Sequence, residues 1–488
     1  MSTPDRGATY LGIDLGTSGL KLTLVGAGGS VVAEAEGAYD VQSPRPGWAE
    51  TDPLDWERAL GLCLDRLAAS SAVVGPLAGP VAGVGFSGQM HGVVLSSPAG
   101  VPLRPALLWP DRRAASVIGR WQELAPEVRG GLANPLVPGM AGPLLTWLSE
   151  HEPALVRDAV VASPKDFLRR RLNGSDSSRD RFGDRSDASA TLLWDLVADD
   201  WSGPALSLAG VRREQLPVMA ASSSVVGATA VLASRGLAAG EVPVVTGAGD
   251  TAAALAGLAA SGAVPEGAVV VNAGTGIQIL RTGVRPSARV DPLTHLYCDA
   301  SVGWYEMLAI QNGGFALTWA QRQLASSWGS SVALAAAVPP GSRGALFLPF
   351  LTGERGGVAP PGATAGWRSL TTSTERPELL RAAFEAYAFT VRRGLEVLGS
   401  PEGPVVLSGG GGRDPWVRQL LADVLGRSLS YVSLRSASAV GAAVLAGRGV
   451  GVELDVPATV VRTDPSGPNV RDRLDEAYAR WVAELQAG

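Results

Sequence analysis

A short polar turn near the start of the chain carries residues that could bind phosphate. Asp14 ends a run with the alternation of a strand, and Thr17 and Ser18 lie between Gly16 and Gly19 before a second alternating run begins. The glycines allow a tight turn, in which backbone N–H groups and the two hydroxyls can surround an anion. Asp14 could hold Mg²⁺ directly or through water. An ordinary hairpin with small polar residues is the alternative interpretation.

The same pattern occurs again about half a chain later. An apolar run over 269–273 contains Asn272. It is followed by Gly274 and Thr275, and another alternating run covers 277–280. The repetition favours the phosphate interpretation and predicts two similar domains that present their turns to a shared cleft. The chain has no Gly-x-x-x-x-Gly-Lys-[Ser/Thr] sequence, so it is not a P-loop protein.

Asp250 is the candidate for a catalytic carboxylate. An apolar strand over 242–246 ends in Gly247-Ala248-Gly249-Asp250, and an Ala- and Leu-rich helix is expected over 251–260. Asp250 suits the N-cap of that helix, where the helix N-terminus would keep its carboxylate ionised. The catalytic role and the N-cap role of Asp250 are compatible. We expect this carboxylate to point into the gap between the two turns, where an ordinary pKa would suffice for a catalytic role.

Two further strand ends carry groups that could contact a sugar. The strand over 81–86 leads to Gln89, Met90 and His91, whose side chains could bond hydroxyls or cover an apolar sugar face at the carboxyl edge of a sheet. A surface turn with an incidental histidine is the alternative. A strand ending at Leu108 is followed by Trp109 and Asp111.

A glycine run near the C-terminus could lie against a nucleotide. Strand 405–408 is followed by four glycines over 409–412, and Asp414 is placed to cap the next helix. Earlier, a Gln-Asn-Gly-Gly run over 311–314 opens another helix, and the segment 347–355 goes from strand to loop. The polar run over 177–187 is predicted to be a surface loop or, as the alternative, a rim of the substrate cleft.

Composition narrows the class of protein. The 488 residues suit two domains, and 46% hydrophobic against 18% charged residues is typical of a globular protein. A net charge of −5 argues against nucleic acid as a partner. The two cysteines and three histidines have no disulfide or zinc spacing. With no signal-peptide pattern and no apolar run of membrane-span length, we expect no membrane partner and a cytoplasmic enzyme.

Taken together, these motifs resemble the FGGY carbohydrate kinases, and within that family most closely the branch that phosphorylates D-xylulose. The likeness covers nearly the whole chain. The runs that carry it are 12–21, 89–92, 108–113, 164–166, 247–250, 274–276, 347–355 and 408–411.

The resemblance implies an α/β fold of two ribonuclease-H-like domains of the actin/hexokinase type that close over ATP, Mg²⁺ and a sugar. The domains would cover residues 1–244 on the sugar side and 245–488 on the nucleotide side, and the enzyme could form a homodimer. Asp250 would be the catalytic base and Asp14 the Mg²⁺ ligand. The implied substrate residues are Gln89, Met90, His91, Trp109, Asp111 and Thr251. The implied cofactor residues are Thr17, Ser18, Lys21, Gly274, Thr275, Asn312, Gly410 and Gly411.

Three departures from the family pattern affect the assignment of the sugar substrate more than the assignment of phosphate transfer. Thr251 and Pro110 stand where Asn is usual, and the segment after Glu354 carries Gly356-Gly357 and a changed run over 366–370. Gluconate, ribulose or another polyol are therefore alternative substrates. An actin-like ATPase or a sugar sensor without phosphate transfer is the alternative from another class.

Overall fold

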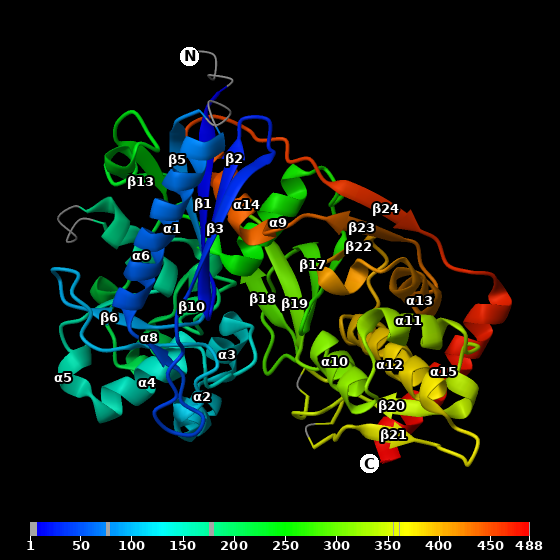
Figure 1. The fold of residues 1–488 in the computed structure, drawn as a ribbon. Coiled ribbons are helices and arrows are strands. Elements are labelled where there is room, and N and C mark those ends of the chain that lie inside the picture. The colour runs from blue at the N-terminus through cyan, green and yellow to red at the C-terminus, as the bar shows by residue number, and fades with distance from the viewer. Residues whose placement is uncertain (1–6, 75–78, 175–179, 355, 361, 488) are drawn as a thin grey trace.

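The computed structural model describes residues 7–74, 79–174, 180–354, 356–360 and 362–487. The chain forms two lobes, each built on a mixed sheet with helices on its faces (Figure 1). The predicted α/β class with two similar domains is therefore confirmed. Arg355 of the predicted 347–355 motif and residues 177–179 of the predicted surface loop lie outside the described residues.

The sheet of the first lobe combines an antiparallel meander with parallel strands. Strand β1 pairs antiparallel with β2, and β2 with β3, while β5 lies parallel to β1 on its other side. Its seven strands are β1 (Thr9–Leu15), β2 (Gly19–Gly26), β3 (Val31–Ala38), β5 (Val81–Gly88), β13 (Val225–Thr229), β14 (Val242–Val245) and β15 (Ala248–Gly249).

The sheet of the second lobe repeats this arrangement. Strands β16, β17 and β19 form the antiparallel meander, and β22 and β23 continue parallel from β16. Its strands are β16 (Val269–Ala273), β17 (Ile277–Val284), β18 (His295–Cys298), β19 (Trp304–Ile310), β22 (Val405–Ser408), β23 (Leu429–Ser433) and β24 (Thr459–Thr463). The Gly-Thr turns thus join the first two strands of each repeat.

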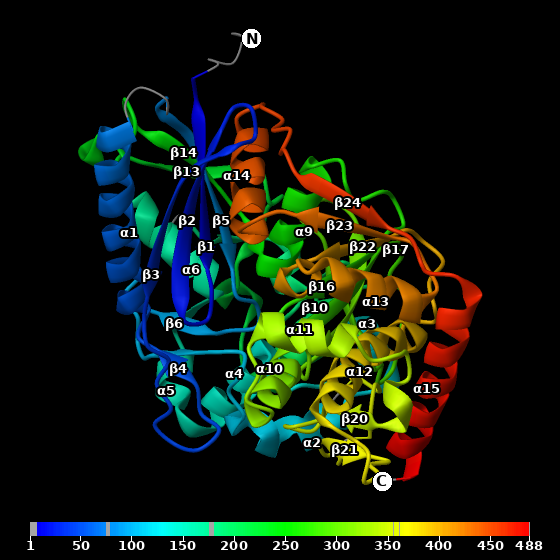
Figure 2. The same ribbon diagram turned by 45° about the vertical axis from the view of Figure 1, so that its right-hand side comes forward.

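Helices cover both sheets. Helix α1 (Pro53–Val74) lies on the meander of the first sheet, and α12 (Arg376–Val397) and α13 (Pro415–Leu425) lie on the second (Figure 2). Asp414 caps α13 through the N–H groups of the next turn, as predicted. The other helices used below are α6 (Pro164–Asn173), α7 (Arg185–Ala188), α10 (Gly314–Gln323), α11 (Trp328–Ala336) and α15 (Pro468–Ala487).

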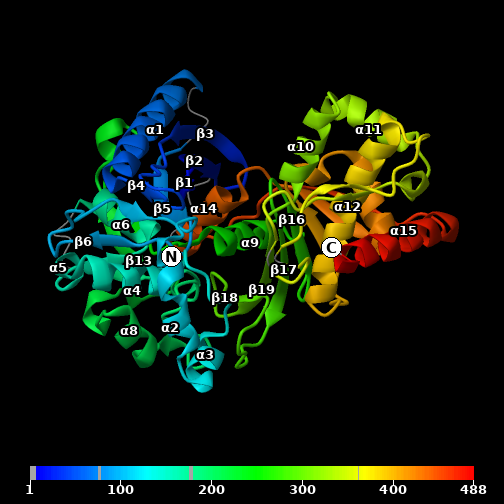
Figure 3. The ribbon, with the colours of Figure 1, turned by 90° about the horizontal axis from the view of Figure 1, so that it is seen from below.

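Two small-residue helices connect the lobes. Helix α9 (Asp250–Ala260) follows the last strands of the first sheet, and α14 (Ala437–Gly449) follows the corresponding strand of the second. They cross in close contact between the lobes, and α14 packs on β1 and β5 of the other lobe (Figures 2 and 3). A Cβ at Gly257 would lie only 2.6 Å from the carbonyl oxygen of Ala437, so the crossing depends on glycine.

Within the part of the chain that the structure describes, no helix is long and apolar enough to cross a membrane.

Candidate active site

Two carboxylates meet where the first sheet gives way to α9. Asp14 lies beside Ser87 of β5 in the parallel pairing, and Gly249 of β15 pairs with Gly88 of the same strand. Asp250 is the next residue and begins α9, with Gly249 at the N-cap, so the predicted N-cap position of Asp250 is wrong by one residue. Both carboxylates are partly exposed. The sheet therefore brings the predicted base and the predicted Mg²⁺ ligand to one edge.

The ionisation of Asp250 departs from expectation. Burial and the negative charge of Asp14 raise its pKa to about 6, against the N–H and hydroxyl of Thr251, which lower it. These two groups donate to Oδ1 of Asp250 over 2.6 and 3.1 Å. Burial also raises the pKa of Asp14, although the Ser87 hydroxyl, 2.8 Å from its Oδ1, and the charge of Lys21 oppose the rise. Asp250 is thus no carboxylate of ordinary pKa, because it is buried and also lies near a like charge.

The first turn is braced from three sides. The N–H of Gly16 donates to the carbonyl of Gly19 over 2.9 Å, which closes the turn. The side-chain amide of Gln89 donates to the carbonyl of Gly16 over 3.0 Å, and the indole of Trp109 donates to the Thr17 hydroxyl over 2.9 Å. Gln89 is buried, so it supports the turn from behind, whereas Trp109 is 41% exposed.

Ser18 and Lys21 lie on the solvent side of the same hairpin. Ser18 is exposed at the tip of the turn. Lys21 faces Asp14 across the β1–β2 pair, and its ammonium lies 2.7 Å from Glu36 of β3.

Met90 and His91 occupy the end of β5. Met90 is buried, and a Cβ on Gly249 would lie 2.8 Å from its Cγ, so Met90 fills the space beside the residue that precedes Asp250. His91 has a φ of 73°, which an L residue rarely adopts. Its Nδ1 lies 2.6 Å from the carbonyl oxygen of Ala190 and therefore carries the proton. Its ring centroid lies 5.9 Å from that of Tyr297 in the second lobe.

Asp111 lies in a buried ion-pair network. Its Oδ1 accepts from the backbone and Nε of Arg113, and its Oδ2 accepts from Arg113 Nη2 and from the N–H of Ala49. The four donors, at 2.7 to 2.9 Å, occupy both oxygens. The predicted substrate contact is thus not supported by this geometry, and Asp111 instead fixes the loop that carries Trp109.

The second turn and the glycine run line one cleft, but the first turn, which was predicted to share a cleft with the second, does not border it. Gly274, Thr275, Gly410 and Gly411 all border a volume of about 500 Å³ in the second lobe. The turn is fixed to the start of α10, because the N–H groups of residues 314 and 315 donate to the carbonyls of Gly274 and Thr275 over 3.1 and 2.9 Å. A Cβ on Gly410 would meet nothing within 4 Å, so the glycine run opens toward this space.

Asn312 is placed differently from its predicted role. It is buried, and its side-chain amide donates to the carbonyl of Gly353 over 2.7 Å and to Glu354 over 3.0 Å. It is not among the residues that border the 500 Å³ cleft. Asn312 joins the start of α10 to the segment after β20 (Leu346–Leu348).

Sequence reasoning missed several residues of the site. Trp328, Tyr387 and Arg413 border the same cleft, but none of them was singled out as a site residue from the sequence. Their recruitment depends on how α11 and α12 pack, which no local motif encodes.

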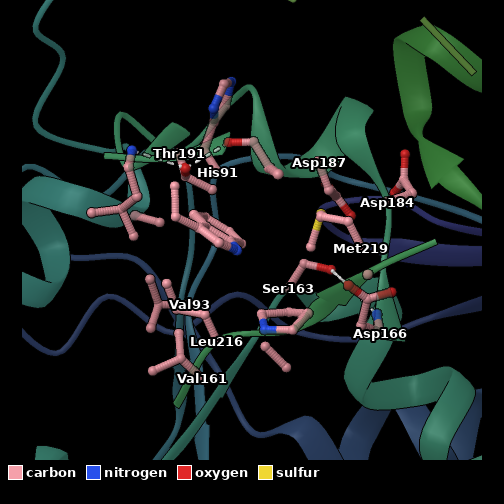
Figure 4. Close-up of a pocket in the computed structure, with 18 residues that line it drawn as sticks. His91, Val93, Val161, Ser163, Asp166, Asp184, Asp187, Thr191, Leu216 and Met219 are labelled. Atoms are coloured by element: carbon pink, nitrogen blue, oxygen red, sulfur yellow. Dashed lines mark hydrogen bonds between the residues drawn. The ribbon is translucent and has the colours of Figure 1, made fainter. Parts of the chain in front are cut away.

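The described part of the polar run over 177–187 also differs from its predicted surface position. Asp184, Ser186 and Asp187 are buried, so the surface-loop expectation is wrong for this part of the segment. Lys165 lies within 3.2 Å of carboxylate oxygens of Asp166, Asp184 and Asp187. Figure 4 shows these three carboxylates at one end of a small cavity of about 40 Å³ that extends to His91, with Val93, Val161 and Leu216 at the other end. Lys165, a buried cation whose partners Asp184 and Asp187 are distant in sequence, was the signal that could have predicted their burial.

Comparison with known proteins agrees with this architecture. Residues 9–257 match the N-terminal domain of the FGGY family of carbohydrate kinases, and residues 269–450 match its C-terminal domain. The chain is 31% identical to a xylulose kinase of Escherichia coli (strain K12), over 97% of this chain and 96% of that protein. It is 32% identical to a xylulose kinase of Klebsiella pneumoniae, over 92% and 91%.

Solved structures and a relative with another substrate give the same picture. The structure of a xyloylose kinase from Brucella ovis has a TM-score of 0.88 and 29% identity, and covers 98% of this chain and 99% of its own. A glycerol kinase of Methylibium petroleiphilum is 29% identical over 97% of this chain and 98% of its own length.

The two repeated α/β lobes correspond to the two domains of a carbohydrate kinase. The chain belongs to the FGGY family of carbohydrate kinases, because the two family models together cover most of its length.

Proposed function

We propose that this cytoplasmic enzyme transfers the γ-phosphate of ATP to O5 of D-xylulose. The observation that carries the proposal is the partly exposed carboxylate of Asp250 beside Asp14, at the edge of the first sheet. The xylulose kinases among its relatives support D-xylulose as the first substrate to test.

Asp250 is the group that receives the proton. The N–H and the hydroxyl of Thr251 both donate to Oδ1 of Asp250, which leaves Oδ2 for a substrate hydroxyl. The hydroxyl oxygen forms the new bond to the γ-phosphorus, the bond to the β-phosphate oxygen breaks, and ADP leaves while the proton passes to Asp250. A pKa of about 6 keeps this carboxylate ionised at neutral pH. Phosphoryl transfer depends mostly on positioning and charge neutralisation, so a weak base suffices.

Asp14 fits the role of an Mg²⁺ ligand. Mg²⁺ in kinases is commonly held by one or two carboxylates together with water and the phosphates of the substrate. The described residues include no group of three or more His, Cys, Asp or Glu that could hold a metal by themselves, and the two neighbouring carboxylates match the sparser pattern. When bound, Mg²⁺ would neutralise charge on the phosphates, and Asp14 would hold it with one oxygen while Ser87 occupies the other.

The cleft of the second lobe is the proposed nucleotide site. Its volume of about 500 Å³ lies in the usual range for small-molecule sites. The backbone of Gly274 and Thr275 would bind the phosphates, and Gly410 and Gly411 would lie against the nucleoside. Thr17, Ser18 and Lys21 of the first turn would contact the terminal phosphate from the other lobe.

The sugar would lie on the first lobe beside Met90, His91, Trp109 and Thr251. The hydroxyl of Thr251 donates a hydrogen bond to Asp250. It therefore orients the base as well as limiting the space for the substrate. The glycerol kinase relative makes other polyols worth testing. The resemblance also leads us to propose a homodimer, which light scattering would test.

A sugar panel with a coupled ADP readout tests the proposal. We expect ADP release that depends on D-xylulose and exceeds that with D-ribulose, gluconate or glycerol. Asp250→Asn should bind ADP normally and lose at least about a hundredfold in sugar-dependent kcat. ATP hydrolysis that is indifferent to every sugar would favour an actin-like ATPase. Near-normal turnover of Asp250→Asn would remove Asp250 from its role.

A further inference from the structure

The four residues before Asp250 form a tight elbow between β14 and α9. Gly247 has a φ of 83°, and a side chain there would collide with the backbone of Phe86. The N–H of Thr246 donates to the carbonyl of Ser224 over 3.0 Å, and the N–H of Gly247 donates to the carbonyl of Ser222 over 2.9 Å. The elbow is thus fixed at its first two residues by neighbouring backbone.

Its last residue is held by a side chain. The N–H of Gly249 donates to Oγ of Ser186 over 2.9 Å, and both groups are buried. Gly249 is the N-cap of α9, and Asp250 is its first residue. A movement of Gly249 therefore turns the carboxylate of Asp250.

Ser186 is itself anchored by a buried ion pair. Its hydroxyl donates to Oδ2 of Asp184, and its N–H donates to the same oxygen over 2.8 Å. Oδ1 of Asp184 lies 3.0 Å from the ammonium of Lys165, which has no exposed surface. The ammonium and Arg169 also donate to the carbonyl of Thr246 over 3.5 and 3.2 Å, so the same cluster holds both ends of the elbow.

We propose that Ser186 is a positioning residue for Asp250, which it orients through Gly249 while Lys165 and Asp184 hold it in place. The inference rests on the proposed function, because it concerns the base of that reaction. Ser186 touches neither sugar nor nucleotide in this role. Its loss should therefore lower kcat and leave the KM values for ATP and sugar nearly unchanged.

Ser189 provides a matched control in the same segment. It is also buried, its hydroxyl accepts the N–H of Cys298 over 3.0 Å, and it donates to the carbonyl of Ser186 over 2.8 Å. Replacing either serine by alanine removes one buried hydroxyl that accepts a backbone N–H. Of these two serines, only Ser186 has a hydroxyl that bonds to the elbow before Asp250.

The test compares steady-state kinetics and melting temperature of Ser186→Ala, Ser186→Thr and Ser189→Ala. We expect kcat to fall about ten- to a hundredfold in Ser186→Ala, since small errors in placing a catalytic group cost factors of this size. The melting temperature of Ser189→Ala should fall by about as much as that of Ser186→Ala, while its kcat should stay at the wild-type value. Ser186→Thr retains the hydroxyl and should recover most of kcat even where its extra methyl lowers the melting temperature.

Equal kcat values in the two alanine variants would overturn the inference. A kcat that falls in step with the melting temperature across the three variants would overturn it as well. A rise in KM without a fall in kcat would also overturn it. If the wild-type chain phosphorylates no sugar, the proposed function fails. If the wild type is active and Ser186→Ala matches Ser189→Ala, only the positioning role fails.

Discussion

Asp250 illustrates how two residues of the same charge can set each other's chemistry. Asp14 lies close enough for its charge to raise the pKa of Asp250, and Lys21 offsets part of the cost at Asp14. A base must be ionised to accept a proton. We expect kcat/KM for sugar to be level above about pH 7 and to fall below about pH 6, approaching tenfold per pH unit. Initial rates between pH 5 and 8 measure this, and a limb near pH 4 would contradict the raised pKa.

The same shift predicts an effect on stability. The folded-state pKa of Asp250 lies above the ordinary value of 3.8, so its favourable contribution is complete below about pH 4 and is lost as the pH rises through about 6. Asp250→Asn should therefore stabilise the free protein at pH 8, by about 1–3 kcal/mol, and gain little at pH 4.5.

Asp111→Asn is the contrasting control. Asp111 is buried against Arg113, so removing its charge leaves that guanidinium with Glu50 as its remaining ion-pair partner and should destabilise the protein at pH 8. Chemical unfolding of both variants at the two pH values gives the comparison. Destabilisation of Asp250→Asn at pH 8 would contradict the cost expected for burying an ionised carboxylate near Asp14.

At this scale the sequence identified residues better than their surroundings. Asp14 and Asp250 could be predicted because strand ends and helix starts leave local signals. The ion pair between Asp111 and Arg113 was not predicted, since two oppositely charged residues that are close in sequence can equally both face a ligand. The burial of Asp184 and Asp187 depends on Lys165, which a different helix supplies.

The elements of the two lobes are joined by a crossing that depends on small residues. Gly441 of α14 lies against the backbone of Ala253 of α9, where a side chain would collide with a carbonyl oxygen. Gly441→Ala should therefore destabilise the protein by about 1–3 kcal/mol through overpacking. Gly329 of α11 is the matched helical glycine, because a Cβ there meets nothing within 4 Å.

Gly329→Ala should stabilise the protein by about 0.4–1 kcal/mol, since alanine loses less entropy than glycine on folding into a helix. Thermal and urea unfolding midpoints of both variants, taken with wild type, measure the difference. Similar effects of the two substitutions would mean that α9 and α14 can separate without cost.

Element boundaries followed from local pattern, whereas their partners did not. The capping residue Asp414 located the start of α13, and the Ala- and Leu-rich run located α9 to within one residue. That α14 packs on β1 and β5 of the opposite lobe could not be predicted, because the helix has similar apolar character on every side. The repeated turn nevertheless predicted the repeated sheet.

At the scale of the molecule, the proposed reactants bind to different lobes. The cleft of about 500 Å³ is lined only by residues of the second lobe, whereas Asp250, Met90 and His91 belong to the edge of the first sheet. Transfer of a phosphate between them requires the lobes to approach. The crossing of α9 and α14 is the connection about which such a movement would occur, since it lies between the two sheets (Figure 3).

Solution scattering can test this movement directly. We expect the radius of gyration to decrease when a non-hydrolysable ATP analogue and D-xylulose are added together, and to decrease less with either one alone, because each ligand by itself contacts mainly one lobe. Asp250→Asn should close in the same way, since the substitution removes the proton acceptor and retains the shape of the site. A radius that stays constant with both ligands would mean that the lobes already stand at their reactive separation, and the transfer would then have to proceed without closure.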